Sequence, residues 1–143
     1  MCVNLKRAMF FMKEYFDKIR EDLNLKYKII DGKKAEVFGS VTYKGLKSEI
    51  ALIAKVYAEG LAYFKLVFDK IDKNLQSLSL VQSLNNEDPF FTAFIRDDGF
   101  LELAHVVRVY NEKFLGEYSA EFMKRAILVL KNKNLKKLDE LIQ

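Results

Sequence analysis

Hydrophobic residues near the start of the chain recur at helical spacing. Between Asn4 and Leu23, six apolar residues follow one another at steps of four and three: Leu5, Met9, Met12, Phe16, Ile19 and Leu23. This spacing places them on one side of an α-helix. Phe10, Phe11 and Tyr15 widen that side beyond a narrow seam. We therefore predict a long N-terminal helix over 4–23 that lies on a broad surface such as a sheet.

The pattern then changes to short runs of β-branched and aromatic residues. Glycine-containing pairs separate these runs, at Asp31-Gly32, Lys44-Gly45 and Glu59-Gly60. Such pairs favour hairpins because glycine readily adopts the positive φ that tight turns require. The pattern predicts four consecutive strands, at Tyr27–Ile30, Ala35–Tyr43, Glu49–Ala58 and Leu61–Phe68.

The third of these runs is apolar at both alternating sets of positions. Its two faces would carry Ile50, Leu52, Ala54 and Val56 on one side, and Ala51, Ile53 and Tyr57 on the other. A strand that is apolar on both faces cannot have either face wholly in water. We therefore expect both faces of this sheet to be covered.

A second helix and a second hairpin follow. Leu75, Leu78, Val81 and Leu84 predict the helix, which Asp72 or Asn74 could cap and which ends near Asn85-Asn86. The hairpin has strands Phe90–Arg96 and Phe100–Tyr110 around Asp97-Asp98-Gly99.

The register of this hairpin determines which residues share a face. A three-residue loop with Gly99 left-handed pairs Arg96 with Phe100. One face is then apolar except for His105, and comprises Phe91, Ala93, Ile95, Leu101, Leu103, His105, Val107 and Val109. The other carries Phe90, Thr92, Phe94, Arg96, Phe100, Glu102, Ala104, Val106, Arg108 and Tyr110. A two-residue loop would pair Ile95 with Glu102 and scatter charge over both faces, so we favour the three-residue loop.

The mixture of aromatic and charged residues on the second face has two interpretations. Either the face packs beneath the domain's own helices, or a second subunit or a client protein covers it. Three helices are few for covering two faces of so apolar a sheet, which favours the second interpretation. We expect the dimer or partner interface to contain Phe90, Phe94, Phe100, Val106 and Tyr110.

The sequence pattern of the C-terminal part predicts a helix followed by a basic tail. Ser119 is placed to cap a helix that carries Met123, Ile127 and Leu130, and Asn132 to Asn134 interrupt it. The tail, 132–143, could be semi-detached. Six basic residues in this region could bind phosphate backbones or an anionic membrane surface: Lys124, Arg125, Lys131, Lys133, Lys136 and Lys137. The alternative, which we favour, is a solvated helix face whose lysines complement the helix dipole.

Composition sets limits on this picture. With 143 residues, half of them hydrophobic, the chain suits a single domain over 1–143. The only cysteine is Cys2, so no intrachain disulfide can form, and we expect a cytoplasmic location. Ala8 to Met12 is too short for a signal-peptide core or a membrane span. The net charge of +4 comes mostly from lysine rather than arginine, so nucleic acid is not the expected partner.

No catalytic or metal-binding constellation stands out. His105 is the only histidine and sits on the apolar face, which favours a structural role over catalysis. The acidic pairs Glu87-Asp88 and Asp97-Asp98 precede Pro89 and Gly99, where turn chemistry explains them better than a bound cation does. The glycines fall singly and the serines lack a hydrolase elbow. We therefore expect no enzyme activity, no metal and no cofactor.

One stretch of the second half resembles a known family. It runs Leu84-Asn85-Asn86-Glu87-Asp88-Pro89-Phe90, then Phe94 to Leu103 around the Asp98-Gly99 turn, then Ser119-Ala120-Glu121-Phe122. A helix ending in leucine-asparagine, an aspartate-glycine turn between alternating apolar residues and a serine-capped last helix resemble the YbjN family of bacterial sensory transduction regulators. The fold of that family is similar to that of type III secretion chaperones. The resemblance implies a small bacterial protein, a homodimer that binds another protein and has no catalytic residues.

Together these observations predict an α+β domain with an antiparallel sheet and N-terminal, middle and C-terminal helices, in the order α-β-β-β-β-α-β-β-α. The function we expect is that of a regulator or chaperone-like module that dimerises and binds a protein partner through apolar sheet surface. The alternative is a nucleic-acid or anionic-surface binder that uses the basic C-terminal helix.

Overall fold

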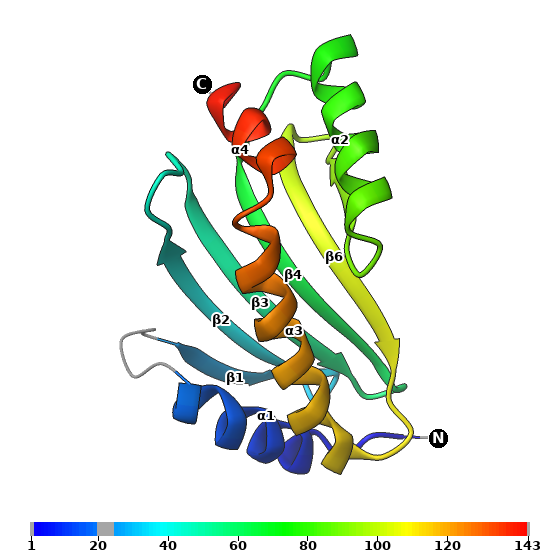
Figure 1. The fold of residues 1–143 in the computed structure, drawn as a ribbon. Coiled ribbons are helices and arrows are strands. Elements are labelled where there is room, and N and C mark those ends of the chain that lie inside the picture. The colour runs from blue at the N-terminus through cyan, green and yellow to red at the C-terminus, as the bar shows by residue number, and fades with distance from the viewer. Residues whose placement is uncertain (1, 20–24, 143) are drawn as a thin grey trace.

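The computed structural model describes residues 2–19 and 25–142 and shows an α+β fold (Figure 1). The helices are α1 (Leu5–Ile19), α2 (Leu75–Glu87), α3 (Leu115–Val129) and α4 (Lys133–Glu140), with a short 3₁₀ turn, η1 (Glu112–Phe114). The strands are β1 (Lys26–Ile30), β2 (Lys34–Thr42), β3 (Glu49–Tyr57), β4 (Leu61–Lys70), β5 (Thr92–Ile95) and β6 (Phe100–Arg108). This order confirms the predicted arrangement, with the C-terminal helix divided in two.

All six strands form one antiparallel sheet in the order β1-β2-β3-β4-β6-β5. The first four strands follow one another as hairpins. The second hairpin then joins through its later strand, β6, which lies beside β4 and leaves β5 at the edge. The four N-terminal strands and the later β5–β6 hairpin thus form one continuous sheet with one core.

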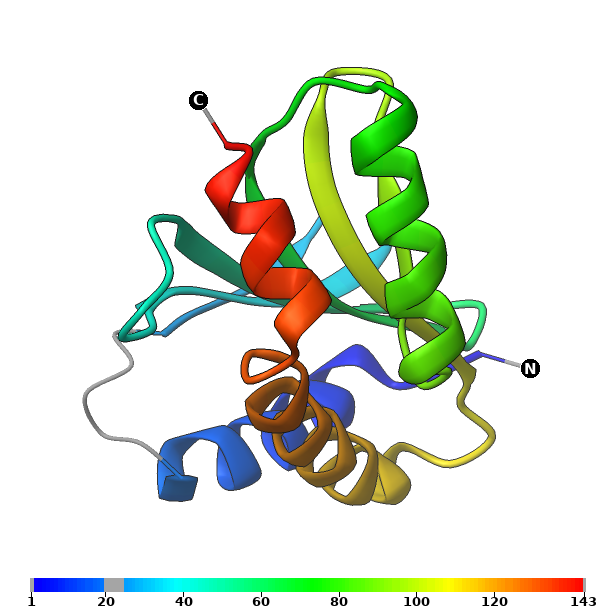
Figure 2. The ribbon, with the colours of Figure 1, turned by 45° about the horizontal axis from the view of Figure 1, so that its top comes forward.

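The helices pack on one face of this sheet, which we call the helix face. In Figure 2, α1 and α3 lie next to each other below the sheet. Helix α4 follows α3 in the chain and extends toward α2. The buried side chains of the helix face alternate along every central strand and include Leu52, Phe64, Leu66 and Leu103. Phe122 of α3 packs its ring against Phe64, with the centroids 5.3 Å apart. The helix face therefore holds the hydrophobic core.

The opposite face, which we call the open face, has no helix on it in the part of the chain that the structure describes. Ala51, Ile53 and Tyr57 of β3 point to this side and remain half-buried. The described helices therefore cover one face, and the expected cover of the other face has to come from another chain. Alternation showed that both faces carry apolar residues, and the described part of the chain supplies helices for one of them.

The second hairpin has the predicted three-residue loop. The Arg96 N–H donates to the Phe100 carbonyl at 2.8 Å, and the Gly99 N–H donates to the Arg96 carbonyl at 2.9 Å. Gly99 has φ +93°, a conformation that a residue with a side chain rarely adopts. Both strands are shorter than predicted, since β5 begins at Thr92 rather than Phe90 and β6 ends at Arg108 rather than Tyr110.

The first two helices agree with the sequence pattern in part. Helix α1 begins at Leu5 and is described to Ile19; its predicted continuation to Leu23 lies outside the described residues. Asn74 caps α2, and its side chain and that of Ser77 bond reciprocally to each other's backbone N–H groups. Of the four apolar residues that predicted α2, Val81 and Leu84 are buried, whereas Leu75 and Leu78 are exposed.

The C-terminal helices differ more from the expectation. Ser119 does not cap a helix, because α3 already begins at Leu115, and Ser119 lies buried in its interior. Asn111 caps the preceding turn, η1. The break before α4 occurs where predicted, with Asn132 as the N-cap.

The basic tail is attached to the domain in the structure. Leu135 and Leu138 of α4 are fully buried, and α4 packs against α2. Asp139 is also buried and accepts hydrogen bonds from the loop between β2 and β3. Residues 133–142 are therefore part of the core rather than a detached segment.

Candidate protein-binding face

The open face presents one alternating set of side chains from all the central strands. By the register of the sheet, this set includes Phe38, Ser40, Ala51, Ile53, Lys55, Tyr57, Tyr63, Lys65, Val67, Thr92, Phe94, Phe100, Glu102, Ala104, Val106 and Arg108. Most of these residues are half-buried by their neighbours within the sheet, while Phe94 and Val106 are 37% and 50% exposed. Large apolar side chains on a face without helices are typical of an interaction surface.

A hollow at this face lies where β4, β5 and β6 meet. It has a volume of about 680 Å³ and is lined by Tyr63, Lys65, Pro89, Phe90, Thr92, Phe94, Glu102, Ala104, His105 and Val106. Apolar side chains predominate in its lining, and Lys65 and Glu102 contribute charge. We call this hollow the β4–β6 groove.

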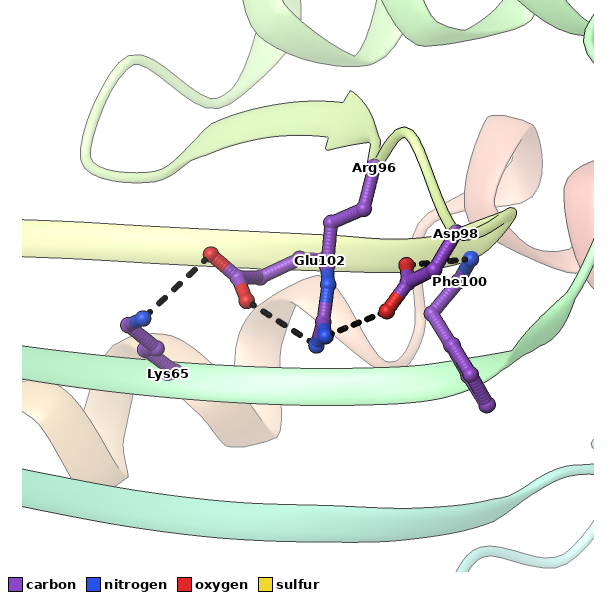
Figure 3. Close-up of polar contacts among 5 residues, drawn as sticks. All are labelled: Lys65, Arg96, Asp98, Phe100 and Glu102. Atoms are coloured by element: carbon purple, nitrogen blue, oxygen red, sulfur yellow. Dashed lines mark hydrogen bonds and ion pairs between the residues drawn. The ribbon is translucent and has the colours of Figure 1, made fainter.

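Glu102 is a buried carboxylate on this otherwise uncovered face. Only 5% of the residue is exposed, and its carboxylate oxygens lie 3.7 Å from Lys65 Nζ and 3.7 Å from Arg96 Nη1. Arg96 also pairs with Asp98 at 2.6 Å, so the four side chains form a chain of alternating charge (Figure 3). Because a buried charge is costly without partners, the two flanking cations stabilise the Glu102 side chain at this position.

Aromatic rings surround this charge network. Lys65 Nζ lies 5.5 Å from the centre of the Tyr63 ring, and the Arg96 guanidinium lies 5.5 Å from the Phe100 ring. Lys70 approaches the same Phe100 ring at 5.3 Å. Ring contacts as well as ion pairs therefore hold these charged groups in place. Together the groups form a row of fixed charged side chains beside the groove.

The structure places the five predicted interface residues in different settings. Phe94 and Val106 lie on the open face and line the groove, and Phe100 is the first residue of β6, with Lys70 and Arg96 close to its ring. Tyr110 lies just beyond β6 and is 71% exposed. Phe90 precedes β5, so strand alternation does not apply to it, and its ring stacks on His105 with centroids 3.9 Å apart.

His105 is held in place by its neighbours. Its Nδ1 lies 2.9 Å from the Phe90 carbonyl oxygen, and the Arg125 guanidinium lies 5.6 Å from the centre of the Phe90 ring. Arg125 Nε donates to Glu121 at 2.8 Å, and this hydrogen bond lowers the pKa of Glu121. These contacts give His105 and Phe90 a packing role at the rim of the groove.

The six basic residues of the C-terminal region do not form one surface. Arg125 is paired with Glu121, and Lys124 and Lys137 are exposed at separate positions on α3 and α4. Lys131, Lys133 and Lys136 instead line a shallow hollow of about 170 Å³ together with Lys44 from the β2–β3 loop. The described residues that line it include no carboxylate.

Tyr63 and Lys65 are among the groove residues that sequence reasoning missed. Both are on β4 and alternate with the core residues Phe64 and Leu66, so the pattern could have placed them on the open face. What the pattern does not reveal is that β4 lies beside β6, where Lys65 pairs with Ala104 and Tyr63 with Val106. That neighbour relation brings both side chains into the groove.

Comparisons of this chain with models of protein families, with curated proteins and with solved structures find no match. None of the described helices is long and apolar enough to cross a membrane. Among the described residues, no group of three or more histidine, cysteine or acidic side chains is placed to hold a metal ion.

Proposed function

We propose that this protein is a non-enzymatic binding module, a regulator or chaperone-like protein, that dimerises and binds a protein partner through the open face of its sheet. The observation that carries the proposal is the mismatch between the sheet and its cover. Strands β3 and β4 carry apolar residues on both faces, and the described helices cover one. A partner that covers the open face removes the exposed apolar surface from water, which is the main driving force of protein association.

The groove adds specificity to this surface. Its apolar walls, Tyr63, Phe94 and Val106, suit an apolar side chain, and the fixed charges of Lys65 and Glu102 at its base select against partners that leave them unpaired. The same combination of an apolar centre and a charged border is common in protein interfaces. The YbjN-like and chaperone-like assignment, and with it a bacterial cytoplasmic protein, is part of this proposal and rests on the sequence resemblance.

Phe94→Asp tests the proposal. The substitution places a charge in the centre of the proposed interface, where burial without a partner is costly. Because Phe94 lies opposite Glu102 on β6, circular dichroism must first show that the variant keeps the fold of the wild type. The matched control is Leu75→Asp, because Leu75 is 87% exposed in the first turn of α2, away from the open face. We expect tagged wild type and Leu75→Asp to retain the same protein at a fixed ratio from lysate of the source cell, and Phe94→Asp to lose it. Equal retention by all three would contradict the proposal.

A second candidate function rests on the hollow lined by Lys44, Lys131, Lys133 and Lys136. Four lysines without a carboxylate among them favour an anionic ligand, such as a phosphate backbone or an anionic surface. Replacing Lys131, Lys133 and Lys136 by glutamine should then abolish binding to DNA or RNA and flatten its dependence on salt. If the wild type binds neither nucleic acid at low salt, nucleic-acid binding by this hollow is excluded.

A further inference from the structure

Two large apolar side chains are exposed among lysines on the outer side of α3. Ile127 and Leu128 are 45% and 52% exposed, and the exposed residues Lys124 and Lys131 flank them three and four positions away along the helix. Side chains at these spacings lie on one side of a helix. We call these four residues the α3 ridge. The outer side of a surface helix is normally polar, so two neighbouring exposed apolar residues indicate an interaction surface.

The α3 ridge ends beside the hollow that the lysines line. Lys131 belongs to both, and Leu130 and Tyr43 line this hollow and also a small hollow of about 50 Å³ that Ile127 borders. Apart from Thr42 and Tyr43, only apolar side chains line the small hollow. The lysines therefore border an apolar surface that extends from α3 to the end of β2.

Contacts of the fold gather the lysines from separate segments. Lys44 lies in a tight turn of the β2–β3 loop, in which Gly45 has φ +98°. The carboxylate of Asp139 accepts three hydrogen bonds from this loop and so holds the loop against α4. Lys133 and Lys136, at the start of α4, thereby line the same hollow as Lys44.

The carboxylates near this surface do not neutralise it. Glu121 of α3 accepts a hydrogen bond from Arg125, and Glu87 of α2 accepts hydrogen bonds from two asparagine amides at the break before α4. Glu140 is exposed at the other end of α4. Among the described residues, no ion pair joins a carboxylate to any of the four lysines of the hollow. The hollow and the α3 ridge therefore keep a positive charge.

We propose that this surface binds an anionic lipid membrane. The lysines contact the headgroups, and Ile127 and Leu128 enter the boundary between the headgroups and the acyl chains, as in interfacial helices. A nucleic-acid backbone would use the lysines but would leave both apolar side chains in water, so the α3 ridge favours a membrane. This inference rests on the second candidate function, the binding of an anionic ligand, and names that ligand.

Membrane binding by this surface is compatible with a protein partner on the open face. Figure 2 shows α3 on the helix side of the sheet, away from the open face. A chain that contacts a membrane through the α3 ridge therefore leaves the open face accessible. The two surfaces can be tested separately for the same reason.

Sedimentation with vesicles tests the inference. One set of vesicles consists of phosphatidylcholine alone, and the other of phosphatidylcholine and phosphatidylserine in equal parts. We expect the wild type to sediment with the mixed vesicles at low salt and to stay in solution with phosphatidylcholine alone. High salt should release most of the bound chain, because it screens the attraction between the lysines and the headgroups.

The first variant replaces Lys131, Lys133 and Lys136 by glutamine. A lysine near an anionic membrane contributes a factor of about five to the affinity, so the triple variant should bind roughly 100-fold more weakly. The matched control changes the net charge equally at three exposed lysines that line neither hollow: Lys6, Lys28 and Lys73. We expect this control to keep most of the vesicle binding.

The second variant, Ile127→Gln with Leu128→Gln, tests insertion. About half of each side chain is available for burial in the membrane, so their loss should weaken vesicle binding roughly tenfold or more. The control is Leu75→Gln with Leu78→Gln, two exposed leucines of α2 that line neither hollow. Leu128→Gln alone is measured as well, because Leu128 lines neither hollow and its replacement leaves their packing unchanged. Circular dichroism checks the fold of each variant.

Three results would overturn the inference. If the wild type binds no vesicles, membrane binding is excluded, and DNA or RNA binding by the lysines decides whether the second candidate function stands. If Leu128→Gln and the double variant bind vesicles as tightly as the wild type, the apolar side chains do not insert, and only anion binding by the lysines remains. If the lysine variant binds vesicles as tightly as the wild type, both the inference and the anionic ligand of this hollow are wrong. Partner binding by the open face is decided independently by the capture experiment with Phe94→Asp.

Discussion

Asp139 attaches the C-terminal helix to the rest of the domain, and its removal should have a large effect on stability. The carboxylate is buried at the end of α4 and accepts three hydrogen bonds from the β2–β3 loop. The donors are the Lys47 N–H at 2.6 Å, the Ser48 N–H at 3.1 Å and the Ser48 hydroxyl at 2.8 Å. Replacing Asp139 by alanine leaves all three without their acceptor.

The size of the effect follows from where the donors lie. Lys47 is exposed, so water can accept a hydrogen bond from its N–H in place of the carboxylate. Ser48 is buried, so water cannot replace the acceptor of its N–H and its hydroxyl. A buried donor without a partner costs about 1–3 kcal/mol, so Asp139→Ala should lower the free energy of unfolding by roughly 2–6 kcal/mol. Ser48→Ala removes only the hydroxyl and leaves the carboxylate bonded to two N–H groups, so it should cost about 1 kcal/mol.

Urea denaturation followed by circular dichroism measures these differences. The matched control is Glu140→Ala, because Glu140 is the exposed acidic neighbour of Asp139 in the same helix and its side chain accepts no hydrogen bond from the β2–β3 loop among the described residues. That control should stay within about 0.5 kcal/mol of the wild type. If Asp139→Ala were no less stable than Glu140→Ala, the proposed attachment of α4 through this carboxylate would be refuted.

Two further changes test other contacts. Asn85→Ala leaves the outward N–H and C=O of Ala93 without a partner and should lower the free energy of unfolding, measured in urea, by about 1–3 kcal/mol. The control Asn86→Ala, at the exposed neighbouring position, should lower it little. Equal losses of stability in the two variants would show that the Asn85 amide does not protect the β5 edge. Glu112 accepts from the Asn4 N–H at 2.7 Å, and this bond lowers the pKa of its carboxyl below the unfolded value of about 4.3. Its contribution is therefore present above that pH and is lost as the pH falls through the lowered pKa, so Glu112→Gln should be less stable than the wild type at pH 7 and match it in acid. A stability difference that does not change with pH would argue against this role of the charge.

Local signals in the sequence predicted much of the fold. The glycine pairs marked the turns between β1 and β4, and the charge distribution selected the correct loop between β5 and β6. Asn132 marked the break before α4 because an asparagine N-cap acts within one turn. These features depend on neighbours along the chain, and such neighbours are visible in a sequence.

Features that depend on distant contacts were not visible. Ser119 resembled an N-cap, but the packing of Leu115 starts α3 one turn earlier. Phe90 matched a strand pattern, but its stacking on His105 draws the chain away before β5 begins. The groove forms only because β4 lies beside β6, and the spacing of hydrophobic residues along the chain does not predict this strand order. Alternation on β3 showed that both faces are apolar without showing whether this chain or another covers them.

The central claim, that another protein covers the open face, is tested most directly by hydroxyl-radical footprinting of its aromatic residues. The modification of Phe94 and Tyr63 is compared between the purified chain at high dilution and the chain in lysate of its source cell, with Leu75 and Phe10 as exposed references on α2 and α1. We predict that Phe94 and Tyr63 become protected in the lysate while the two references do not change. Equal modification of all four residues in both conditions would contradict the account.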